Sequence, residues 1–526
     1  MPKVLVSDTL SPAAVRAFEE RGIAVDVITG LAADDLKTIL WEYDGLAVRS
    51  ATRVTADLLA TAERLKVVGR AGIGVDNIDV VAASQLGIVV MNTPFGNATT
   101  TAEHAIAMIM AMARNIPQAN ASTHAGRWEK SRFMGMELCG KTLGVIGCGN
   151  IGAIVADRAH GLRMRVVAFD PYLSQERAVE LGVERVGLDE LLMRADIITL
   201  HTPLTDATRG IIDAAALAKA RPGVCVVNCA RGGLVVEADL LAALRDGHVR
   251  AAALDVFEQE PARDNPLFGL DNVICTPHLG ASTAEAQENV AVQVAEQMAD
   301  YLLTGAVTNA LNMPSVSAED APRLRPYMRL AERIGALAGQ ITRSSLSQVT
   351  VEYQGDAAAL NVKPLTAVLL QGLLAPQMES VNMVNAPLIA RERDIQVSEV
   401  RTDACPDYHS VVRLTVTTER QTRTVAGTLF GGAKPRIIDI NGVPMEAELG
   451  RHVLYVVNED QPGFIGALGT VLGEAGVNIA SFHLGRDVRG GQAVALVSVD
   501  QAVAGPLLDR IQALPHVVQA LPLEFP

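Results

Sequence analysis

Short apolar runs alternate with amphipathic segments from Lys3 to Cys275. The first runs, KVLV, AVDV, GLAV, KVV and IVV, have the length and β-branched content of buried strands, and PAAVRAFEE between the first two has helical spacing. Alternating strands and helices are typical of a parallel sheet covered by helices. We predict that residues 1–97 form one α/β unit, whose first strand-to-helix turn lacks a glycine-rich phosphate site.

A second strand–helix series begins at KTLGVIG and continues through RVVAF, DIITL, VCVVN, VRAAAL and NVIC. A helix is predicted before it from about Thr100, where Thr100 and Glu103 match a capping box. Another capping box, Ser282 with Glu285, opens a predicted helix of about 20 residues that ends near Gly305. This helix follows the last strand of the series, so we expect it to pack back against the first unit.

The remaining chain has a different pattern. Residues 314–326 contain prolines and polar side chains and are predicted to form a linker. A region with a helical pattern followed by strands comes next. From Arg451 onward the predicted order is βαββαβ, which is that of a ferredoxin-like unit.

The glycines in GVIGCGNIG match a dinucleotide-binding turn. Gly147, Gly149 and Gly152 lie between a predicted strand and a predicted helix, and Asp170 ends the next strand. The glycines permit a tight turn, close approach of a pyrophosphate and close helix packing, while the helix N-terminus attracts phosphate. Asp170 would accept hydrogen bonds from a ribose and repel a 2′-phosphate, which favours NAD, although Arg177 nearby leaves NADP open.

Three later strands end in polar motifs that contain Arg231, Glu260 and His278. The carboxyl ends of parallel strands share one edge of the sheet, where ligands bind. Oxidation of a hydroxy acid needs a base such as His278, a carboxylate such as Glu260 that orients it, and a guanidinium such as Arg231 for the substrate carboxylate. Asp255 would reach the nicotinamide amide or structure the adjacent loop.

The cofactor is expected to contact the glycine turn and the strand ends that face it. This set comprises Gly147, Gly149, Asn150, Ile151, Gly152, Asp170, Thr202, Pro203, Cys229, Ala230, Arg231, Asp255, His278, Gly280 and Ala281.

The composition of the chain limits the kinds of partner and the cellular location that we expect. The formal net charge of −14 argues against nucleic acid or an anionic membrane as the main partner. The six cysteines lack zinc-ligand spacing and are expected to be reduced core thiols, and no metal site is predicted. The N-terminus has no apolar signal core, so we expect a soluble, cytoplasmic protein.

Several motifs resemble the D-isomer-specific 2-hydroxyacid dehydrogenases, namely GRAGIGVDNID, NTPFGNATTTAEH, GVIGCGNIG, NCARGG, LDVFEQEP and TPHLGAST. The resemblance implies that Arg231, Glu260 and His278 are the catalytic set. It also implies a Rossmann-like NAD domain inserted in a discontinuous, flavodoxin-like substrate domain.

The segment NEDQPGFIGALGTVLGEAGVNIA resembles an ACT domain, and the chain as a whole resembles the long-form D-3-phosphoglycerate dehydrogenase family. This resemblance implies NAD-dependent oxidation of 3-phospho-D-glycerate to 3-phosphohydroxypyruvate in L-serine biosynthesis, with inhibition by serine and assembly as a homotetramer or dimer. The implied division of this α/β chain is residues 1–97 and 283–316 for the substrate domain, 98–282 for the NAD domain, 317–450 for an α+β intervening domain and 451–526 for the ferredoxin-like ACT domain.

A phosphorylated substrate would need several cationic and polar groups. Arg49 and Arg70 end strands of the first unit and are expected to face the cleft with Ser50, Gly72 and Asn97. Arg132, reaching in from a neighbouring subunit, is also expected to bind the substrate. The residues expected to bind serine are Asn458, Asp460 and Asn478.

Four points stay open: the reaction, a scaffold role in place of catalysis, the role of the ACT domain and the role of a basic cluster. The chain could be another D-2-hydroxyacid dehydrogenase, such as a glyoxylate or hydroxypyruvate reductase, or an NAD-sensing scaffold of the co-repressor kind. The ACT domain could serve assembly alone. A basic cluster near the junction of the last two domains, Lys434, Arg436, Arg451 and His452, could bind an anion or be merely solvated.

Overall fold

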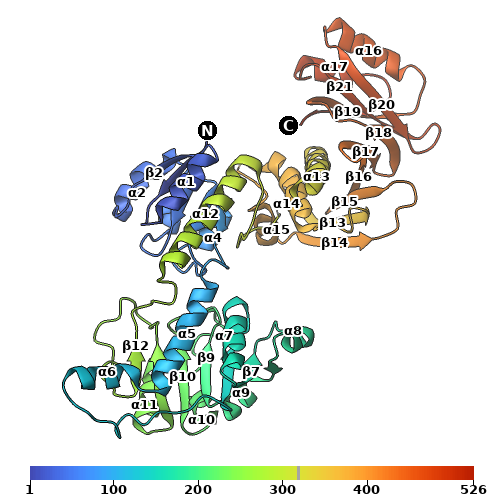
Figure 1. The fold of residues 1–526 in the computed structure, drawn as a ribbon. Coiled ribbons are helices and arrows are strands. Elements are labelled where there is room, and N and C mark those ends of the chain that lie inside the picture. Colours follow the sequence, from blue (N-terminus) through green and yellow to red (C-terminus); the bar gives the residue numbers. More distant parts are fainter. Residues whose placement is uncertain (317–319, 379, 526) are drawn as a thin grey trace.

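The computed structural model describes residues 1–316, 320–378 and 380–525, and that part of the chain contains four sheets (Figure 1). The first two are parallel throughout, and the last two are mostly or wholly antiparallel. The structure therefore confirms the predicted α/β class with two smaller α+β units after it. The predicted boundary at residue 317 lies outside the described residues.

The N-terminal sheet has the strand order β2-β1-β3-β4-β5, which is the flavodoxin-like order. Its strands are β1 (Lys3–Val6), β2 (Ala24–Val27), β3 (Gly45–Val48), β4 (Val67–Arg70) and β5 (Val89–Met91). The helices of this unit are α1 (Pro12–Glu20), α2 (Ala33–Ile39), the 3₁₀ turn η1 (Leu40–Glu42), α3 (Ala56–Leu59) and α4 (Val80–Gln85).

Helix α12 (Ala284–Thr304) returns to this sheet, as the pattern predicts (Figure 1). Its apolar face, including Val294 and Met298, joins the core beneath the N-terminal strands. Arg21, directly after α1, forms ion pairs with Glu296 and Asp300 on α12. Segments before residue 98 and after residue 283 thus build one unit.

The predicted helix caps are displaced. The N-cap of α12 is Thr283, not Ser282, and its hydroxyl accepts the Ala286 N–H at 3.2 Å. Helix α5 (Ala98–Ala113) begins before Thr100, with Asn97 as its N-cap. The residue that adopts the non-helical backbone required of a cap lies one position after Ser282 and three positions before Thr100, and the sequence motif alone does not reveal it. The predicted end of α12 at Gly305 is confirmed, with φ of +75°.

The second parallel sheet has the order β12-β11-β10-β9-β6-β7-β8. Its strands are β6 (Thr142–Ile146), β7 (Arg165–Phe169), β8 (Glu184–Arg185), β9 (Ile197–Leu200), β10 (Val224–Asn228), β11 (Val249–Leu254) and β12 (Val273–Cys275). The other helices of this unit are α6 (Ile116–His124), α7 (Asn150–Gly161), α8 (Gln175–Glu180), α9 (Leu188–Arg194), α10 (Ala214–Lys219) and α11 (Glu237–Arg245). The strand order reverses next to β6, because β7 and β8 lie on one side of it and β9 to β12 lie on the other. Such a reversal creates the crevice where parallel sheets bind nucleotides.

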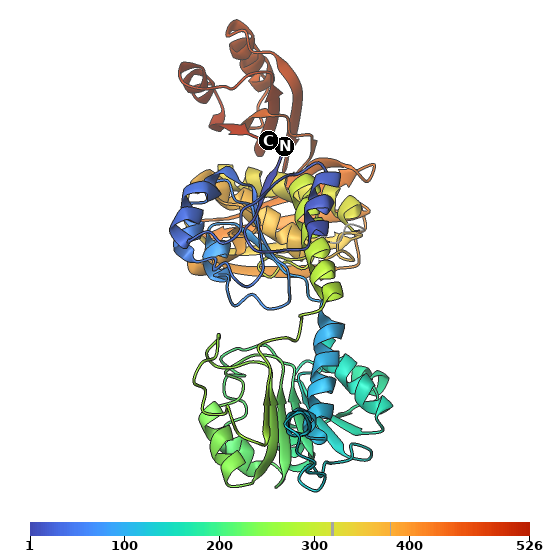
Figure 2. The same ribbon diagram turned by 60° about the vertical axis from the view of Figure 1, so that its left-hand side comes forward.

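Two short connections join this sheet to the N-terminal unit. Figures 1 and 2 both show α5 leading into the second unit and the segment before α12 leading out beside it. Because the two crossings lie together, the units can face each other across a cleft while remaining separate bodies.

The third sheet has the order β14-β13-β15-β16-β17-β18. Its strands are β13 (Leu346–Gly355), β14 (Gln396–Thr402), β15 (Ser410–Thr418), β16 (Thr422–Phe430), β17 (Lys434–Ile440) and β18 (Val443–Ala447). Its helices are α13 (Ala321–Ile341), α14 (Lys363–Leu374), η2 (Ala375–Gln377) and α15 (Ala386–Glu392). The predicted linker over 314–326 is wrong in its second half, because α13 begins within it and Pro322 occupies the first turn, where no amide hydrogen bond is lost.

The last sheet has the order β20-β21-β19-β22 and confirms the ferredoxin-like prediction. Its elements are β19 (His452–Glu459), α16 (Phe464–Glu474), β20 (Ile479–Arg486), β21 (Gln492–Val499), α17 (Pro506–Gln512) and β22 (Val517–Glu524). Strand β21 is antiparallel to both β19 and β20, so β19 and β20 run in the same direction.

The third unit attaches to the N-terminal unit at the C-terminal end of α4. The side-chain amide of Asn382 donates to the Gly87 carbonyl at 2.9 Å, and that of Asn385 donates to the Gln85 carbonyl at 3.4 Å. Val384 is buried in the core of the N-terminal unit. In the described ranges, no hydrogen bond or ion pair joins residues 98–282 to the chain beyond α13, and Figures 1 and 2 show these parts well apart.

Candidate active site

A histidine–carboxylate pair lies at the carboxyl edge of the second parallel sheet. His278 Nδ1 is 2.7 Å from Glu260 Oε2. The backbone N–H of His278 is held by the Asp255 carbonyl, and His278 has a left-handed backbone with φ of +55°. This arrangement leaves the other ring nitrogen, Nε2, for a substrate proton.

Glu260 is positioned by a second hydrogen bond, in which the Phe257 N–H donates to Oε1 at 3.1 Å. Burial alone would raise the pKa of Glu260, but the hydrogen bonds from His278 and the Phe257 N–H hold its pKa below the usual value. Glu260 is therefore ionised at neutral pH and is suited to stabilise a positive charge on the imidazole.

Arg231 extends from the end of β10 toward the N-terminal unit. Its Nε donates to Asp76 Oδ2 at 2.9 Å, and Nη1 donates to its own neighbour, the Ala230 carbonyl, at 2.7 Å. The loop beneath it is fixed by Asn228, whose side chain bonds both the Arg231 carbonyl and the Ala230 N–H. Arg231 thus spans the cleft between the two parallel-sheet units.

Three guanidinium groups gather at this cleft. Burial lowers the pKa of Arg70 to about 10, and the nearby positive charges of Arg231 and Arg49 act in the same direction. Arg70 Nε donates to Asn77 Oδ1 at 3.1 Å. The structure therefore brings Arg49 and Arg70 together with Arg231, and such a cluster would stabilise a multiply charged anion.

The smaller predicted substrate groups lie around the same cleft. The Gly72 N–H donates to Thr93 Oγ1 at 2.8 Å, and Gly72 packs against the Arg70 guanidinium. Ser50 is exposed next to Arg49. Asn97 Oδ1 is buried and has no hydrogen-bond partner among the described residues.

Arg132 does not join this cluster within one chain. It forms ion pairs with Glu129 and Asp271 on the outer surface of the second unit. Its expected role in a neighbouring subunit's site stays a prediction.

The glycine turn has the geometry that a dinucleotide requires. Gly147 has φ of +89°, and a Cβ on Gly152 would lie 2.0 Å from the Gly147 carbonyl oxygen. Gly149, the N-cap of α7, faces open space where a Cβ would meet nothing within 4 Å. Asp170 accepts the Cys148 N–H at 2.9 Å, so its carboxylate is directed at the turn. These residues fit a dinucleotide pyrophosphate and ribose.

The other expected cofactor positions follow the same edge. Asn150 begins α7, and its side chain reaches the Pro94 carbonyl at 3.4 Å, while Gly280 is buried beneath the cleft. Further positions, on α7 or in loops after strands, are Ile151, Thr202, Pro203, Cys229, Ala230 and Ala281. Cys229 is buried, and burial raises the pKa of its thiol, so it contributes shape rather than charge.

Asp255 structures the loop, which is one of its two expected roles, and its contact with the nicotinamide amide stays a prediction. It is fully buried and accepts hydrogen bonds from the Thr276 hydroxyl at 2.6 Å and from the N–H groups of Leu279 and Gly280 at 2.7 and 2.8 Å. His104 Nε2 on α5 lies 3.2 Å from the same carboxylate. With its oxygens engaged in this way, Asp255 holds the segment that carries His278.

Sequence reasoning missed Asp76 and His104. Asp76 follows the end of β4 in the motif GIGVDNID, so the strand-end rule that selected Arg70 could have found it. His104 lies inside a helix among apolar residues and gives no signal of its own until α5 is placed beside β12.

The predicted serine positions do not meet within one chain. Asn458 is near the end of β19, and Asp460 follows it, whereas Asn478 precedes β20. Since β19 and β20 run in the same direction, Asn458 and Asn478 lie at opposite edges of the sheet, about 20 Å apart at roughly 3.3 Å per residue along β21. Asp460 pairs with Arg486 at 2.8 Å, and Asn478 bonds Asp500. The expected role of these three residues in binding serine stays a prediction.

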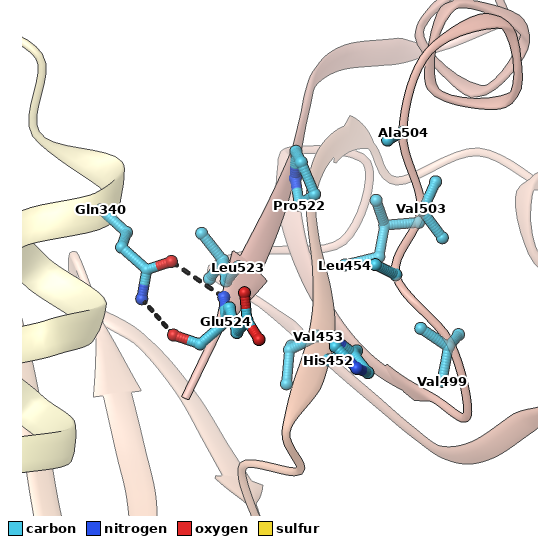
Figure 3. A pocket seen from close by; sticks show the side chains of 11 residues that line it. Gln340, His452, Val453, Leu454, Val499, Val503, Ala504, Pro522, Leu523 and Glu524 are labelled. Carbon is cyan, nitrogen blue, oxygen red and sulfur yellow. Dashed lines mark hydrogen bonds between the residues drawn. The ribbon is translucent and has the colours of Figure 1, made fainter. Parts of the chain in front are cut away.

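A separate cavity of about 250 Å³ lies where α13 meets the last sheet (Figure 3). Gln340 bonds the Glu524 backbone there, and His452 lies at the cavity wall among apolar side chains. Arg436 pairs with Glu448 and Arg451 with Glu524, so carboxylates already neutralise two members of the predicted basic cluster. Lys434 is exposed.

The remaining expectations concern the cysteines, a metal site and membrane-spanning helices. All six cysteines are free, but Cys139 and Cys275 are exposed, so the expectation of core thiols is wrong for these two. Within the described residues, no group of three His, Cys, Asp or Glu side chains is arranged to hold a metal ion. None of the helices in the described ranges has the length and hydropathy of a membrane span.

Three family models match the chain. The D-isomer specific 2-hydroxyacid dehydrogenase NAD-binding domain matches residues 106–280, the D-3-phosphoglycerate dehydrogenase intervening domain matches 323–441, and the ACT domain matches 452–516.

Relatives of known function are similar to this chain over nearly its full length. D-3-phosphoglycerate dehydrogenase of Synechocystis sp. is 43% identical over 97% of this chain and 92% of its own. The enzyme of that name from Bacillus subtilis is 41% identical over 100% of both chains. The one from Mycobacterium tuberculosis is 42% identical over 98% of this chain and 97% of its own.

Solved structures match the two parallel-sheet units. The TT0316 protein from Thermus thermophilus has a TM-score of 0.55 and 34% identity, and the match covers 59% of this chain and 99% of that chain. D-Lactate dehydrogenase from Aquifex aeolicus, complexed with NAD and lactic acid, has a TM-score of 0.53 and 27% identity over 60% of this chain and 100% of that chain. These two matches cover about 60% of this chain, whereas the relatives similar over the full length also cover the two C-terminal units.

Proposed function

This chain belongs to the D-3-phosphoglycerate dehydrogenase family, and on that premise we propose that it oxidises 3-phospho-D-glycerate to 3-phosphohydroxypyruvate with NAD⁺. The observation that carries the proposal is the His278–Glu260 pair at 2.7 Å, on the same sheet edge as Arg231, whose charge in turn acts on Arg70 of the N-terminal unit. NAD⁺, when bound at the glycine turn, supplies the hydride acceptor.

His278 is the proposed catalytic base. Its Nε2 takes the proton of the substrate hydroxyl, while Glu260 fixes the tautomer through Nδ1 and stabilises the imidazolium that forms. Asp255 keeps the His278 loop in place through its bonds to the neighbouring backbone.

The arginines have distinct proposed roles. Arg231 binds the substrate carboxylate and places the carbinol carbon near the base. Arg49 and Arg70 bind the phosphate from the opposite wall of the cleft, aided by Asn97 and the backbone near Gly72. The phosphate contacts would distinguish this substrate from lactate or glyoxylate, which lack that group.

The activity is tested by NADH formation at 340 nm with D-3-phosphoglycerate and, separately, with D-glycerate and glycolate. We expect kcat/KM to be highest for the phosphorylated acid. Faster turnover of an unphosphorylated acid would favour a glyoxylate or hydroxypyruvate reductase, and no turnover of any acid would favour an NAD-sensing scaffold.

We also propose that L-serine inhibits the enzyme by binding between ACT units of two chains. The opposite placement of Asn458 and Asn478 supports this arrangement, since a second chain is needed to bring the two edges together. Asn458 Oδ1 is buried without a partner in the described chain and can receive a ligand donor. Inhibition that is absent at all serine concentrations would leave the ACT unit an assembly element.

A further inference from the structure

Helix α5 contacts the segment that carries His278, the proposed base. The helix enters the second unit directly from the N-terminal unit and lies against β10, β11 and β12 (Figure 1). Three of its residues, Thr101, His104 and Met108, are spaced i, i+3 and i+7, so they share one face of the helix. This face, here called the α5 ridge, meets the chain on both sides of His278.

Each residue of the α5 ridge has a partner in that segment. A Cβ on Gly280 would lie 3.3 Å from Thr101 Cγ2, so the backbone passes closely over Thr101. The Sδ atom of Met108 is 3.9 Å from the Thr276 hydroxyl, and His104 Nε2 is 3.3 Å from the same hydroxyl. The ridge therefore contacts the segment two residues before and two residues after the proposed base.

The hydrogen bonds around His104 fix its role. The Thr276 hydroxyl donates its proton to Asp255 Oδ1 at 2.6 Å, so its oxygen can only accept from His104 Nε2. Asp255 Oδ1 lies 3.2 Å from the same nitrogen and is also an acceptor. Because both atoms that face Nε2 are acceptors, this nitrogen carries a proton and donates it.

Asp255 is a buried charge that depends on its donors. Burial alone would raise the pKa of Asp255, but the hydrogen bonds that it accepts, first among them the one from His104, hold the pKa below its usual value. In the described ranges, His104 is the only basic side chain within ion-pair distance of Asp255. The same carboxylate accepts the N–H groups of Leu279 and Gly280, directly after His278. Loss of the His104 donor would therefore loosen the group that fixes the base.

We propose that His104 is a positioning residue, which holds His278 in place through Asp255 and so ties the base to the helix that joins the two parallel-sheet units. This rests on the proposed role of His278 as the base. Within the described residues, no hydrogen bond or ion pair joins the His104 side chain to the glycine turn or to the arginines of the cleft. Its effect should therefore fall on kcat and not on KM for the acid.

The test is His104→Leu, which keeps a bulky side chain but removes the donor. We expect kcat with D-3-phosphoglycerate to fall about tenfold, the size typical of one hydrogen bond to a charged group, while KM for the acid stays within about threefold. His104→Gln places an amide N–H near the position of Nε2 and should restore kcat to within about threefold of wild type. Glu103→Gln, at an exposed position of α5, is the matched control and should change neither constant.

A double-mutant cycle shows whether His104 acts through the base. In the His278→Ala background, adding His104→Leu should change the residual kcat less than about twofold, since no base is left to position. A further tenfold loss would mean general damage to the site and would overturn the proposal. Failure of His104→Gln to restore the rate would overturn it as well.

Hydrogen exchange tests the positioning without any turnover. His104→Leu should speed exchange about tenfold in the peptide that contains Leu279 and Gly280, because both amides donate to the carboxylate that His104 holds, while the β6 peptide stays unchanged. Unchanged exchange would overturn the proposal, whereas absence of turnover in the wild-type enzyme would overturn only the proposed function. If His104→Leu does not fold, His104→Asn, whose shorter amide cannot reach Asp255, replaces it in every measurement.

Discussion

The second parallel sheet and the ACT sheet (β20-β21-β19-β22) differ in where the residues at their strand ends lie. In the parallel sheet, residues that follow β10, β11 and β12 lie on one edge, and His278 meets Glu260 there. In the ACT sheet, Asn458 near the end of β19 and Asn478 before β20 lie at opposite edges. Positions selected by motif therefore lie together in the first sheet and apart in the second.

The physical reason is the direction of the strands. Every strand of a parallel sheet delivers its carboxyl end to the same edge, so a single chain can assemble a site from distant segments. When two strands run in the same direction, the last residue of one and the first residue of the other are separated by about one strand length. Such residues can meet only when a second copy of the sheet presents its opposite edge, which ties regulation to assembly.

The largest effect is expected for His278→Ala, which tests whether the residues at the carboxyl edge of the second parallel sheet act as one catalytic site. We expect kcat to fall about 10²- to 10⁴-fold, because the hydroxyl proton loses its acceptor, while NAD affinity is retained. Stopped-flow or steady-state NADH formation measures the rate, and fluorescence titration measures NAD binding. His248→Ala, at the far end of β11, is the control and should retain full activity. Turnover within threefold of wild type would mean that the edge does not act as one catalytic site.

The cofactor part of the same edge is tested by Asp170→Ala. Loss of the charged acceptor for the ribose should raise KM for NAD about 10- to 100-fold with a smaller change in kcat. KM for NADP should fall relative to wild type, since a 2′-phosphate is no longer repelled. Asp189→Ala on α9, which is exposed and paired with Lys219, serves as the matched control. An unchanged KM for NAD would remove Asp170 from the cofactor site.

The Glu260–His278 pair gives a pH-dependent prediction. The pKa of Glu260 is lowered, so its charge persists at neutral pH and is lost only as pH falls through that lowered value. Glu260→Gln lacks the charge at every pH, and we expect kcat about tenfold below wild type near neutrality. The two enzymes should converge in acid, where wild type also loses the carboxylate. A constant ratio across the pH profile would show that the charge is irrelevant.

The smallest effect on turnover is expected in the ACT sheet. Asn478→Ala and Asp460→Ala should leave uninhibited kcat unchanged, while the serine concentration for half-inhibition rises about tenfold through loss of one hydrogen bond each. Mixing the two variants should restore some sensitivity, because an interface between different chains can contain one intact pair of half-sites. Equal insensitivity of the mixture would contradict a site shared between chains.

Much of the catalytic edge was predictable because its signals are local and strong. The glycine spacing before α7 and the position of Asp170 follow from backbone requirements, and the strand-end rule selects Arg231, Glu260 and His278. The rest depends on contacts that no short motif encodes. Asp255 is assigned to the loop only once Thr276 and Gly280 are seen around it, and Asp76 matters only because Arg231 crosses the cleft.

Boundaries were predicted less well for related reasons. Ser282 and Thr283 are both good caps, and the extended backbone of Thr283 determines which one acts. Proline suggested a linker before α13, yet proline also suits the first turn of a helix. The separation of Asn458 from Asn478 could not be predicted, because a motif gives the residues but not the strand directions.

The attachment of Asn382 to Gly87 has a thermodynamic consequence. The C-terminal units touch the wall that holds Arg49 and Arg70 and leave the cofactor wall free of hydrogen bonds or ion pairs to the chain beyond α13 in the described ranges. Any linkage between serine and the cleft should then be felt first in the affinity for the hydroxy acid. Linkage is reciprocal, so saturation with the hydroxy acid must change the affinity for serine by the same factor.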